Sequence, residues 1–295
     1  MIDVQSPTVR GHAAMLLFSA LVAGSFALGS RVANQIDPAA LNAVRFLLAS
    51  LIIGALVFLG PGIKRKDLRA PWRYVVLGGL FSVYFVTMFE GLKTAAPVSA
   101  SAVFTLTPVL AAGFGWLLLR QITTARMALA LLLAAGGAVW VIFRGDAGAI
   151  LAFEIGKGEM IFFIGVVAHA LYTPLITLLN RGEKPLVFTL GTMVAGFVLL
   201  SLYGANSLLN TDFGSLPTLV WLTIAYVTIF ASAATFYLLQ YAALHLKAAK
   251  VMAYTYLVPA WVIAWEFALG GGMVPVVVML GVVAVIVALL MLLTD

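Results

Sequence analysis

Hydrophobic residues fill ten long stretches of this chain, and short polar segments separate them. An apolar run of about 20 residues is what an α-helix needs to cross hydrocarbon with every backbone polar group bonded internally. The pattern therefore predicts an all-α integral membrane protein with ten transmembrane helices and no room for a soluble catalytic domain. The predicted spans are His12–Ser30, Pro38–Leu59, Trp72–Gly91, Pro97–Leu119, Ala125–Phe143, Gly158–Leu179, Pro185–Tyr203, Leu216–Ala243, Ala248–Leu269 and Val274–Leu293.

Composition narrows the class further. Hydrophobic residues make up 63% of the 295 residues and charged residues only 9%, whereas a soluble domain carries about 25% charged residues. The chain has no cysteine, which excludes disulfides and thiolate metal sites, and we expect no metal ion and no other cofactor. The net charge of +6 is attributed to membrane topology, so the expected partner is the lipid bilayer and not a nucleic acid.

Basic residues are distributed unequally between the two sides of the predicted bundle. With ten spans both termini lie on one side, and twelve lysines and arginines fall there, against four on the other. Because cytoplasmic loops carry the excess of Lys and Arg, both termini are predicted to be cytoplasmic. The N-terminal segment lacks a cleavage signature, so the first span is expected to be retained. The twelve are Arg10, Lys64, Arg65, Lys66, Arg69, Arg73, Arg120, Arg126, Arg181, Lys184, Lys247 and Lys250, and the four are Arg31, Lys93, Arg144 and Lys157.

The second half of the chain repeats features of the first. The most informative match pairs the mid-helix prolines Pro108 and Pro259, since proline removes a helical hydrogen bond and interrupts each span at an equivalent point. We predict two five-helix repeats, 1–148 and 149–295, and an odd number of helices forces the second to cross the membrane inverted. A shift of 151 residues superposes Phe85 on Phe236, Ala102 on Ala253, Leu106 on Leu257, Pro108 on Pro259, Leu118 on Leu269 and Leu129 on Leu280.

Short motifs in both halves carry a family resemblance. They are Ala23-Gly24-Ser25 in span 1, Arg45-Phe46-Leu47-Leu48-Ala49 after Pro38 in span 2, Leu106-Thr107-Pro108-Val109-Leu110-Ala111-Ala112 in span 4, Gly136-Gly137-Ala138-Val139 in span 5, and Leu257-Val258-Pro259-Ala260 in span 9. On these motifs the chain resembles the EamA-type members of the drug/metabolite transporter superfamily, and most of all the bacterial aromatic amino-acid exporters. It departs from them where Arg120 and Gly271 replace a common glutamate.

The resemblance implies a multi-pass secondary transporter of the bacterial inner membrane, with spans 3, 4, 8 and 9 around a central cavity. Alternating access between the two repeats would then carry amino acids, above all aromatic ones and related small metabolites, from cytoplasm to periplasm. A drug or another metabolite of the same superfamily is the alternative cargo. We expect a monomer, with a dimer as the alternative.

Charged residues near the spans are candidates for the site and its gates. Arg45 lies inside span 2, where a buried cation is costly and points to a pathway, so it is expected to line the outward vestibule or to meet a substrate carboxylate. The alternative is that Arg45 snorkels outward or bonds to carbonyls at a helix end. Glu90 and Glu266 are candidates for a gate or vestibule, with Glu90 as a partner for Arg45. Glu159 is expected to be solvated.

Uncharged side chains complete the candidate site. His169 lies deep in span 6, and in the absence of a midplane carboxylate it favours a site-lining or structural role over proton relay. Tyr254, Val258, Trp261 and Trp265 share one face of span 9 and are predicted to stack planar rings. On span 4, Ser101, Thr105 and Pro108 form a stripe that permits close packing or lines the pore. The remaining cavity-lining candidates are Tyr84, Met88, Tyr237 and Pro259.

No enzyme motif is present in the sequence. It contains no HExxH pattern, and Gly270-Gly271-Gly272 lacks the Lys-Ser/Thr of a phosphate-binding loop, so no ATP-driven motor is predicted. The alternative from a different class, an integral-membrane lipid-modifying enzyme, would need a cluster of titratable residues at one face. The sequence offers only scattered ones, so we predict a transporter without catalytic residues.

Overall fold

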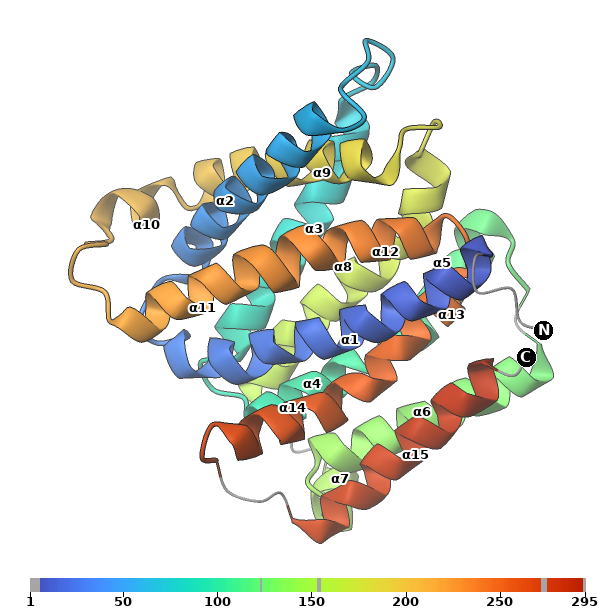
Figure 1. The fold of residues 1–295 in the computed structure, drawn as a ribbon. Helices are drawn as coiled ribbons and strands as arrows, with labels where there is room; N and C mark the ends of the chain where they lie inside the picture. The colour runs from blue at the N-terminus through green and yellow to red at the C-terminus, as the bar shows by residue number, and fades with distance from the viewer. Residues whose placement is uncertain (1–5, 123, 153–154, 272–274, 294–295) are drawn as a thin grey trace.

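The computed structural model describes residues 6–122, 124–152, 155–271 and 275–293, and within these ranges the chain is helical, with no strand (Figure 1). Among the described residues nine helical segments are long and apolar enough to cross a membrane, and Val276–Leu292 is a shorter apolar helix. The predicted all-α membrane fold is confirmed. The beginning of α1 and the end of α15 lie at one end of the bundle, which we call the N-terminal side.

Seven of the predicted spans are single helices in the described residues. The first begins five residues earlier than predicted, because the Ser6 side chain accepts a hydrogen bond from the Val9 N–H and Pro7 suits the first helical turn. Two short helices in the loops, α7 (Ala147–Ala152) and α10 (Ala205–Asn210), were not predicted. The single-helix spans are α1 (Pro7–Val32), α2 (Pro38–Leu59), α3 (Trp72–Gly91), α6 (Ala125–Ile142), α8 (Lys157–Leu179), α9 (Pro185–Tyr203) and α15 (Val276–Leu293).

Spans 4 and 9 break at the prolines, as predicted. Span 4 divides into α4 (Pro97–Phe104) and α5 (Thr107–Leu119). Pro108 has no N–H for the Phe104 carbonyl, and the Thr107 hydroxyl donates to that carbonyl instead, at 2.5 Å. Span 9 divides into α13 (Ala248–Ala253), the 3₁₀ turn η2 (Tyr254–Leu257) and α14 (Val258–Ala268), with Pro259 in the first turn of α14.

Span 8 contains an interruption that was not predicted. A π-helix, η1 (Ile229–Ala234), joins α11 (Thr218–Thr228) to α12 (Thr235–Ala243). The Ser232 hydroxyl donates to the Val227 carbonyl at 2.8 Å. π-helical turns are rare and frequently lie at functional sites.

The spans contact one another in the pairs that an inverted repeat requires. Span 3 packs on span 6 as span 8 packs on span 1, while spans 2 and 7, 4 and 9, and 5 and 10 pack on each other. This arrangement fits two five-helix repeats. The boundary between residues 148 and 149 lies within α7 and stays a prediction.

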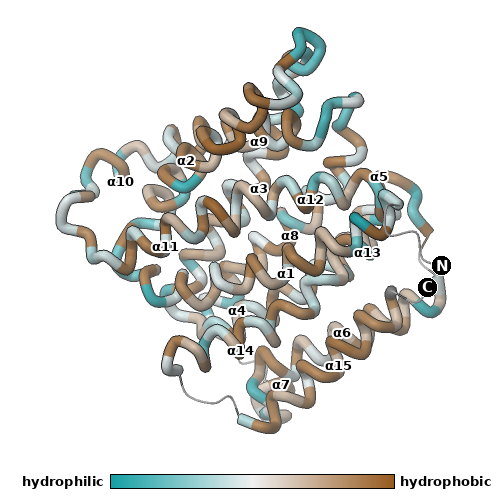
Figure 2. The backbone as a smooth tube through the Cα atoms, viewed as in Figure 1, coloured by the Kyte–Doolittle hydropathy of each residue, from teal (hydrophilic) through white to brown (hydrophobic). Residues whose placement is uncertain are grey.

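Hydrophobic and hydrophilic residues are separated between the middle and the two ends of the bundle. Hydrophobic residues run along the helices, and hydrophilic ones gather in the end loops, above all between α2 and α3 (Figure 2).

At one edge of the bundle α6 and α15 lie side by side. There a Cβ added at Gly137 would lie 2.8 Å from the Gly281 carbonyl oxygen, and one added at Gly281 would lie 2.6 Å from the Gly137 oxygen. Only glycine permits this approach.

Candidate substrate site

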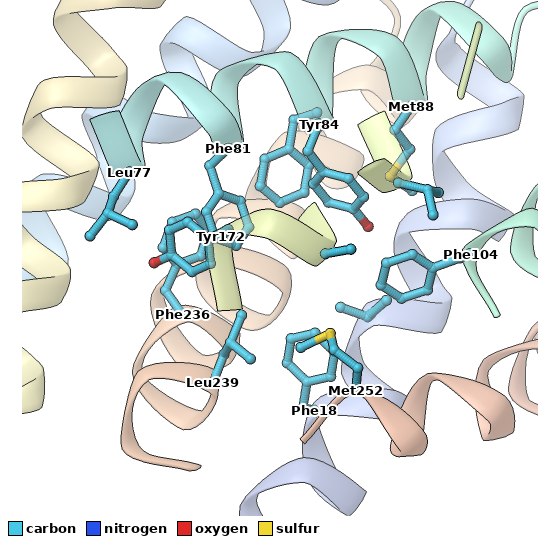
Figure 3. Close-up of a cluster of buried hydrophobic side chains, with 14 of the residues drawn as sticks. Phe18, Leu77, Phe81, Tyr84, Met88, Phe104, Tyr172, Phe236, Leu239 and Met252 are labelled. Carbon is cyan, nitrogen blue, oxygen red and sulfur yellow. The ribbon is translucent and has the colours of Figure 1, made fainter. Parts of the chain in front are cut away.

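Aromatic side chains fill the centre of the bundle (Figure 3). They come from α1, α3, α4, α8 and α12, and each is almost completely buried. The shortest ring-centroid distances are 4.0 Å between Phe81 and Tyr172 and 4.1 Å between Phe81 and Phe236. We call this set the central aromatic cluster, and its members are Phe18, Phe81, Tyr84, Phe85, Phe104, His169, Tyr172 and Phe236.

His169 lies within this cluster. Its ring stacks on Tyr84 at 4.5 Å and lies 5.2 Å from Phe104 and 5.3 Å from Phe81. The side chain is 1% exposed, and Nδ1 has no hydrogen-bond partner in the described part of the chain. Buried polar atoms in proteins are nearly always bonded. An unbonded imidazole nitrogen between aromatic rings is therefore available to a polar group of a ligand.

Arg45 lies next to the cluster and is completely buried. Its guanidinium carbon lies 3.7 Å above the centre of the Phe85 ring. Nη2 donates to the Ala231 carbonyl and Nε to the Ser232 hydroxyl, each at 2.5 Å, and Nη1 donates to Asn42 Oδ1 at 3.3 Å. In the described residues no carboxylate forms an ion pair with Arg45.

The same contacts lie within the π-helix. The Ala231 carbonyl of η1 accepts a hydrogen bond from the Arg45 guanidinium, which belongs to another helix. A polar group that inserts into the helical ladder is a known cause of such local distortions. Because Arg45 belongs to span 2 and η1 to span 8, this link joins the two halves of the chain.

A buried polar contact lies on the N-terminal side of the cluster. Gln240 Nε2 donates to the Tyr172 hydroxyl at 3.0 Å and lies 3.4 Å from Thr192 Oγ1. The other end of the Gln240 amide has no partner in the described residues. The free end is a second polar position beside the rings.

The aromatic face of span 9 does not join the cluster. Its side chains contact the neighbouring helices instead: the Tyr254 hydroxyl lies 3.0 Å from His12 Nδ1, and Trp261 Nε1 donates to Ser19 Oγ at 3.3 Å. Trp265 packs edge-on against Tyr226 at 5.5 Å. Trp261 is 40% exposed on the outside of the bundle. Span 9 contributes the buried Met252 to the centre (Figure 3).

The other uncharged candidates divide between the centre and the perimeter. Tyr84 and Met88 are buried in the centre. Ser101 and Thr105 are buried, and their hydroxyls donate to the carbonyls of Val98 and Ala102 in their own helix, which agrees with close packing. Tyr237, in contrast, is 39% exposed and lines a groove on the outer surface. The two prolines are buried, at the breaks of spans 4 and 9.

Two predictions about carboxylates are wrong, and the gate role of Glu266 stays a prediction. The pairing of Glu90 with Arg45 is wrong, because Glu90 pairs with Lys93, three residues later, at 2.6 Å. The solvated position of Glu159 is also wrong, since its side chain is buried and accepts a hydrogen bond from Ser99 at 2.7 Å. Glu266, the stronger gate candidate, forms an ion pair with Arg31 at 2.6 Å.

A second ion pair lies at the other end of the bundle. On the N-terminal side Arg73 Nη2 donates to Glu183 Oε1 at 2.6 Å, and both side chains are buried. Burial raises the pKa of Glu183, but hydrogen bonds from Arg73 and from the Arg181 N–H outweigh it and hold that pKa below 4.5. Arg31–Glu266 and Arg73–Glu183 each join one half of the chain to the other.

Sequence reasoning missed several residues of the centre. Phe104, Tyr172 and Phe236 were not among the residues proposed for the site, although they surround residues that were. One signal was present, because Phe85 and Phe236 are paired by the internal repeat. In the described residues no group of three or more His, Asp or Glu side chains is placed to hold a metal ion.

Comparison with known proteins decides the family. The EamA-like transporter family matches residues 9–143 and again residues 156–294. This chain belongs to that family. It is thus a multi-pass membrane protein of a transporter family, and its curated relatives are named as transporters of uncharacterised substrate.

Relatives and a solved structure support this assignment. The chain is 29% identical to the uncharacterised transporter YyaM of Bacillus subtilis (strain 168), across 87% of this chain and 85% of that protein. An uncharacterised transporter of Archaeoglobus fulgidus is 27% identical, across 70% and 71% of the two chains. A crystal structure described only as that of a protein has a TM-score of 0.73 at 20% identity, covering 97% of this chain and 96% of its own, which shows the shared fold.

Proposed function

We propose that this protein is a secondary transporter that exports amino acids, above all aromatic ones, and that its substrate carboxylate binds Arg45. The observation that carries the proposal is a buried guanidinium next to the central aromatic cluster, with no carboxylate partner among the described residues. A guanidinium has five N–H donors. Arg45 forms three hydrogen bonds, all to uncharged acceptors, so two donors stay available for a carboxylate.

The neighbouring rings supply the second half of the recognition. Phe85 lies directly under the Arg45 guanidinium, and Phe81, Tyr84 and Phe236 extend from it into the bundle. Aromatic pairs are favoured by about 0.5–1.5 kcal/mol beyond the area that they bury. A substrate that carries a carboxylate at one end and a planar ring at the other matches both features. The unbonded His169 nitrogen and the free end of Gln240 are available to polar groups on that ring.

Alternating access fits the two ion pairs between the halves of the chain. Arg31–Glu266 joins span 1 to span 9 at the end opposite the N-terminal side, and Arg73–Glu183 joins α3 to the loop between α8 and α9 on the N-terminal side. Opening one pair at a time would expose the centre to one side of the membrane. The excess of basic residues on the N-terminal side supports a cytoplasmic position for that end. Export is then transport from the N-terminal side to the opposite side.

A second class of cargo has its own supporting observation. Among the described residues, no carboxylate is a member of the central aromatic cluster or forms an ion pair with Arg45. An aromatic organic acid without an amino group therefore fits the same contacts. Aromatic metabolites of this kind are the alternative cargo.

Uptake by the purified protein in proteoliposomes tests the proposal. We expect radiolabelled phenylalanine and tryptophan to be transported faster than threonine. Arg45→Gln should weaken transport roughly tenfold or more, because a hydrogen bond to a charged group contributes about 1.5–3 kcal/mol. Arg45→Lys, which keeps the charge, should be impaired less, and Lys157→Gln, an exposed cation far from the cluster, should change nothing.

Folding and function are separated by a second measurement. Tryptophan should raise the thermal unfolding temperature of the wild-type protein and should not raise that of Arg45→Gln. Equal transport of aromatic and small amino acids would refute the specificity. Competition by an aromatic acid without an amino group, with no transport of amino acids, would favour the alternative cargo.

A further inference from the structure

A groove on the outer surface lies directly behind the π-helix. It has a volume of about 720 Å³, and the residues that line it come from α2, the loop that follows it, the beginning of α9, η1 and α12. Its walls are apolar over most of their length, with Ile52 and Leu56 on one side and Ile229 and Ala233 on the other. A volume of roughly 300–1,000 Å³ is typical of sites for small molecules.

The groove is about as long as one leaflet of the bilayer is deep. Its wall on α2 extends from Ile52 to Gly60 at the end of that helix. At 1.5 Å per residue this is about 12 Å, close to half of the roughly 30 Å hydrocarbon core. The groove therefore reaches from the middle of the membrane to the headgroups on the N-terminal side, and an acyl chain of that leaflet fits along it.

A cation lies at the headgroup end. Lys184 lines the groove, is exposed, and forms no ion pair in the described residues. The adjacent Glu183 cannot neutralise it, because that carboxylate is buried against Arg73. Pro61, also in the groove wall, begins the loop that carries the exposed Lys64, Arg65 and Lys66. An apolar groove that ends among exposed cations has the charge pattern of a site for an anionic phospholipid.

We propose that this groove binds an anionic phospholipid from the leaflet on the N-terminal side, with one acyl chain along the groove and the phosphate at Lys184. The lipid then supports the π-helix that holds Arg45. Ile229, Ala233 and Ala234 form part of the groove wall, whereas Ala231 and Ser232 of the same segment accept hydrogen bonds from Arg45. Tyr237, which lies outside the central aromatic cluster, forms part of the wall of this lipid site.

Native mass spectrometry of the full-length protein with equal amounts of phosphatidylglycerol and phosphatidylethanolamine tests this site. The wild-type protein should retain the anionic lipid preferentially. Lys184→Gln should lower the ratio of retained phosphatidylglycerol to phosphatidylethanolamine about fivefold, the factor expected for one cation near an anionic surface. Leu56→Trp, at a half-exposed position of the groove wall, should lower the retention of both lipids by filling the groove.

The matched control is Lys157→Gln, which removes an exposed cation at the opposite end of the bundle and should leave the ratio unchanged. Equal retention of both lipids by the wild-type protein would overturn the proposal, as would an unchanged ratio in Lys184→Gln. Lipid retention is measured without substrate. A failure here is therefore distinct from a failure of the proposed transport of amino acids.

Discussion

Phe85 and Phe236, the two residues that the internal repeat superposes, stack on each other at the centre of the bundle. Their ring centroids lie 6.0 Å apart and the rings are inclined by 17°. An axis that relates the two repeats must pass close to any pair of equivalent residues that touch. On the predicted repeat, this contact places the axis that relates the two halves close to the central aromatic cluster, next to Arg45.

This contact predicts energetic coupling between the halves. Phe85→Leu and Phe236→Leu should each lower stability, and the double variant should lose less than the sum of the two, by about 0.5–1.5 kcal/mol. Unfolding of the four proteins in detergent measures the coupling. Simple additivity would mean that the two rings are neighbours without a specific interaction.

Substrate preference distinguishes the centre from span 9. Phe81→Ala removes a ring from the central aromatic cluster and should reduce transport of aromatic amino acids roughly three- to tenfold relative to threonine. Trp261→Ala removes a ring that is exposed and bonded to Ser19, and should leave that ratio unchanged. Competitive uptake in proteoliposomes provides both ratios. A lower ratio in Trp261→Ala and an unchanged ratio in Phe81→Ala would show that the substrate ring binds at span 9 and not at the central aromatic cluster.

The Arg31–Glu266 pair predicts a change in access to the centre. Glu266→Gln should raise the labelling rate of a cysteine placed at the buried Met88 by about two- to fivefold, because a partly exposed ion pair contributes up to about 1 kcal/mol. The natural absence of cysteine makes this label specific. The exchanged pair, Arg31→Glu with Glu266→Arg, should restore slow labelling, and persistently fast labelling there would show that charge pairing is not the cause.

The Arg73–Glu183 pair predicts a pH dependence of stability. Because the pKa of Glu183 is lower in the folded protein than its ordinary value of 4.5, the pair stabilises fully above about pH 4.5 and this contribution is lost as the pH falls further. At pH 7, Glu183→Gln should cost about 3 kcal/mol, since Arg73 stays buried without its partner. Thermal unfolding between pH 3 and 7 measures both effects. Glu90→Gln, in an exposed pair, is the control and should cost less than about 1 kcal/mol.

Topology can be tested with the same cysteine-free background. A cysteine at Lys66 and one at Ala205, both exposed positions, lie in loops at opposite ends of the bundle. An impermeant reagent added to intact cells should label only the second, if the N-terminal side is cytoplasmic. Labelling of both from outside would contradict the arrangement of spans.

The sequence predicted the spans well and the side-chain environment poorly, for a physical reason. Apolar length is imposed by the bilayer, and proline acts on its own helix, so the spans and the breaks at Pro108 and Pro259 were readable from local sequence. The π-helix is bonded to Arg45, and the buried Glu159 is bonded to Ser99, and in each case the partner is far away in the chain.

Helix orientation was the least predictable feature. A membrane helix that is hydrophobic all round gives no amphipathic signal for the face that points inward. The tryptophans of span 9 share one face, as their spacing requires, but that face contacts α1 and α11. Only the repeat carried long-range information, through Phe85 and Phe236.

The close contact of Gly137 with Gly281 has a consequence for biosynthesis. The two glycines are about 140 residues apart, so at roughly 5–20 residues per second α6 is made roughly 7–28 s before α15 is complete. Throughout that interval the glycine face of α6 lacks its partner, and lipid or the insertion machinery must cover it. Assembly of this edge of the bundle therefore waits until α15 has left the ribosome.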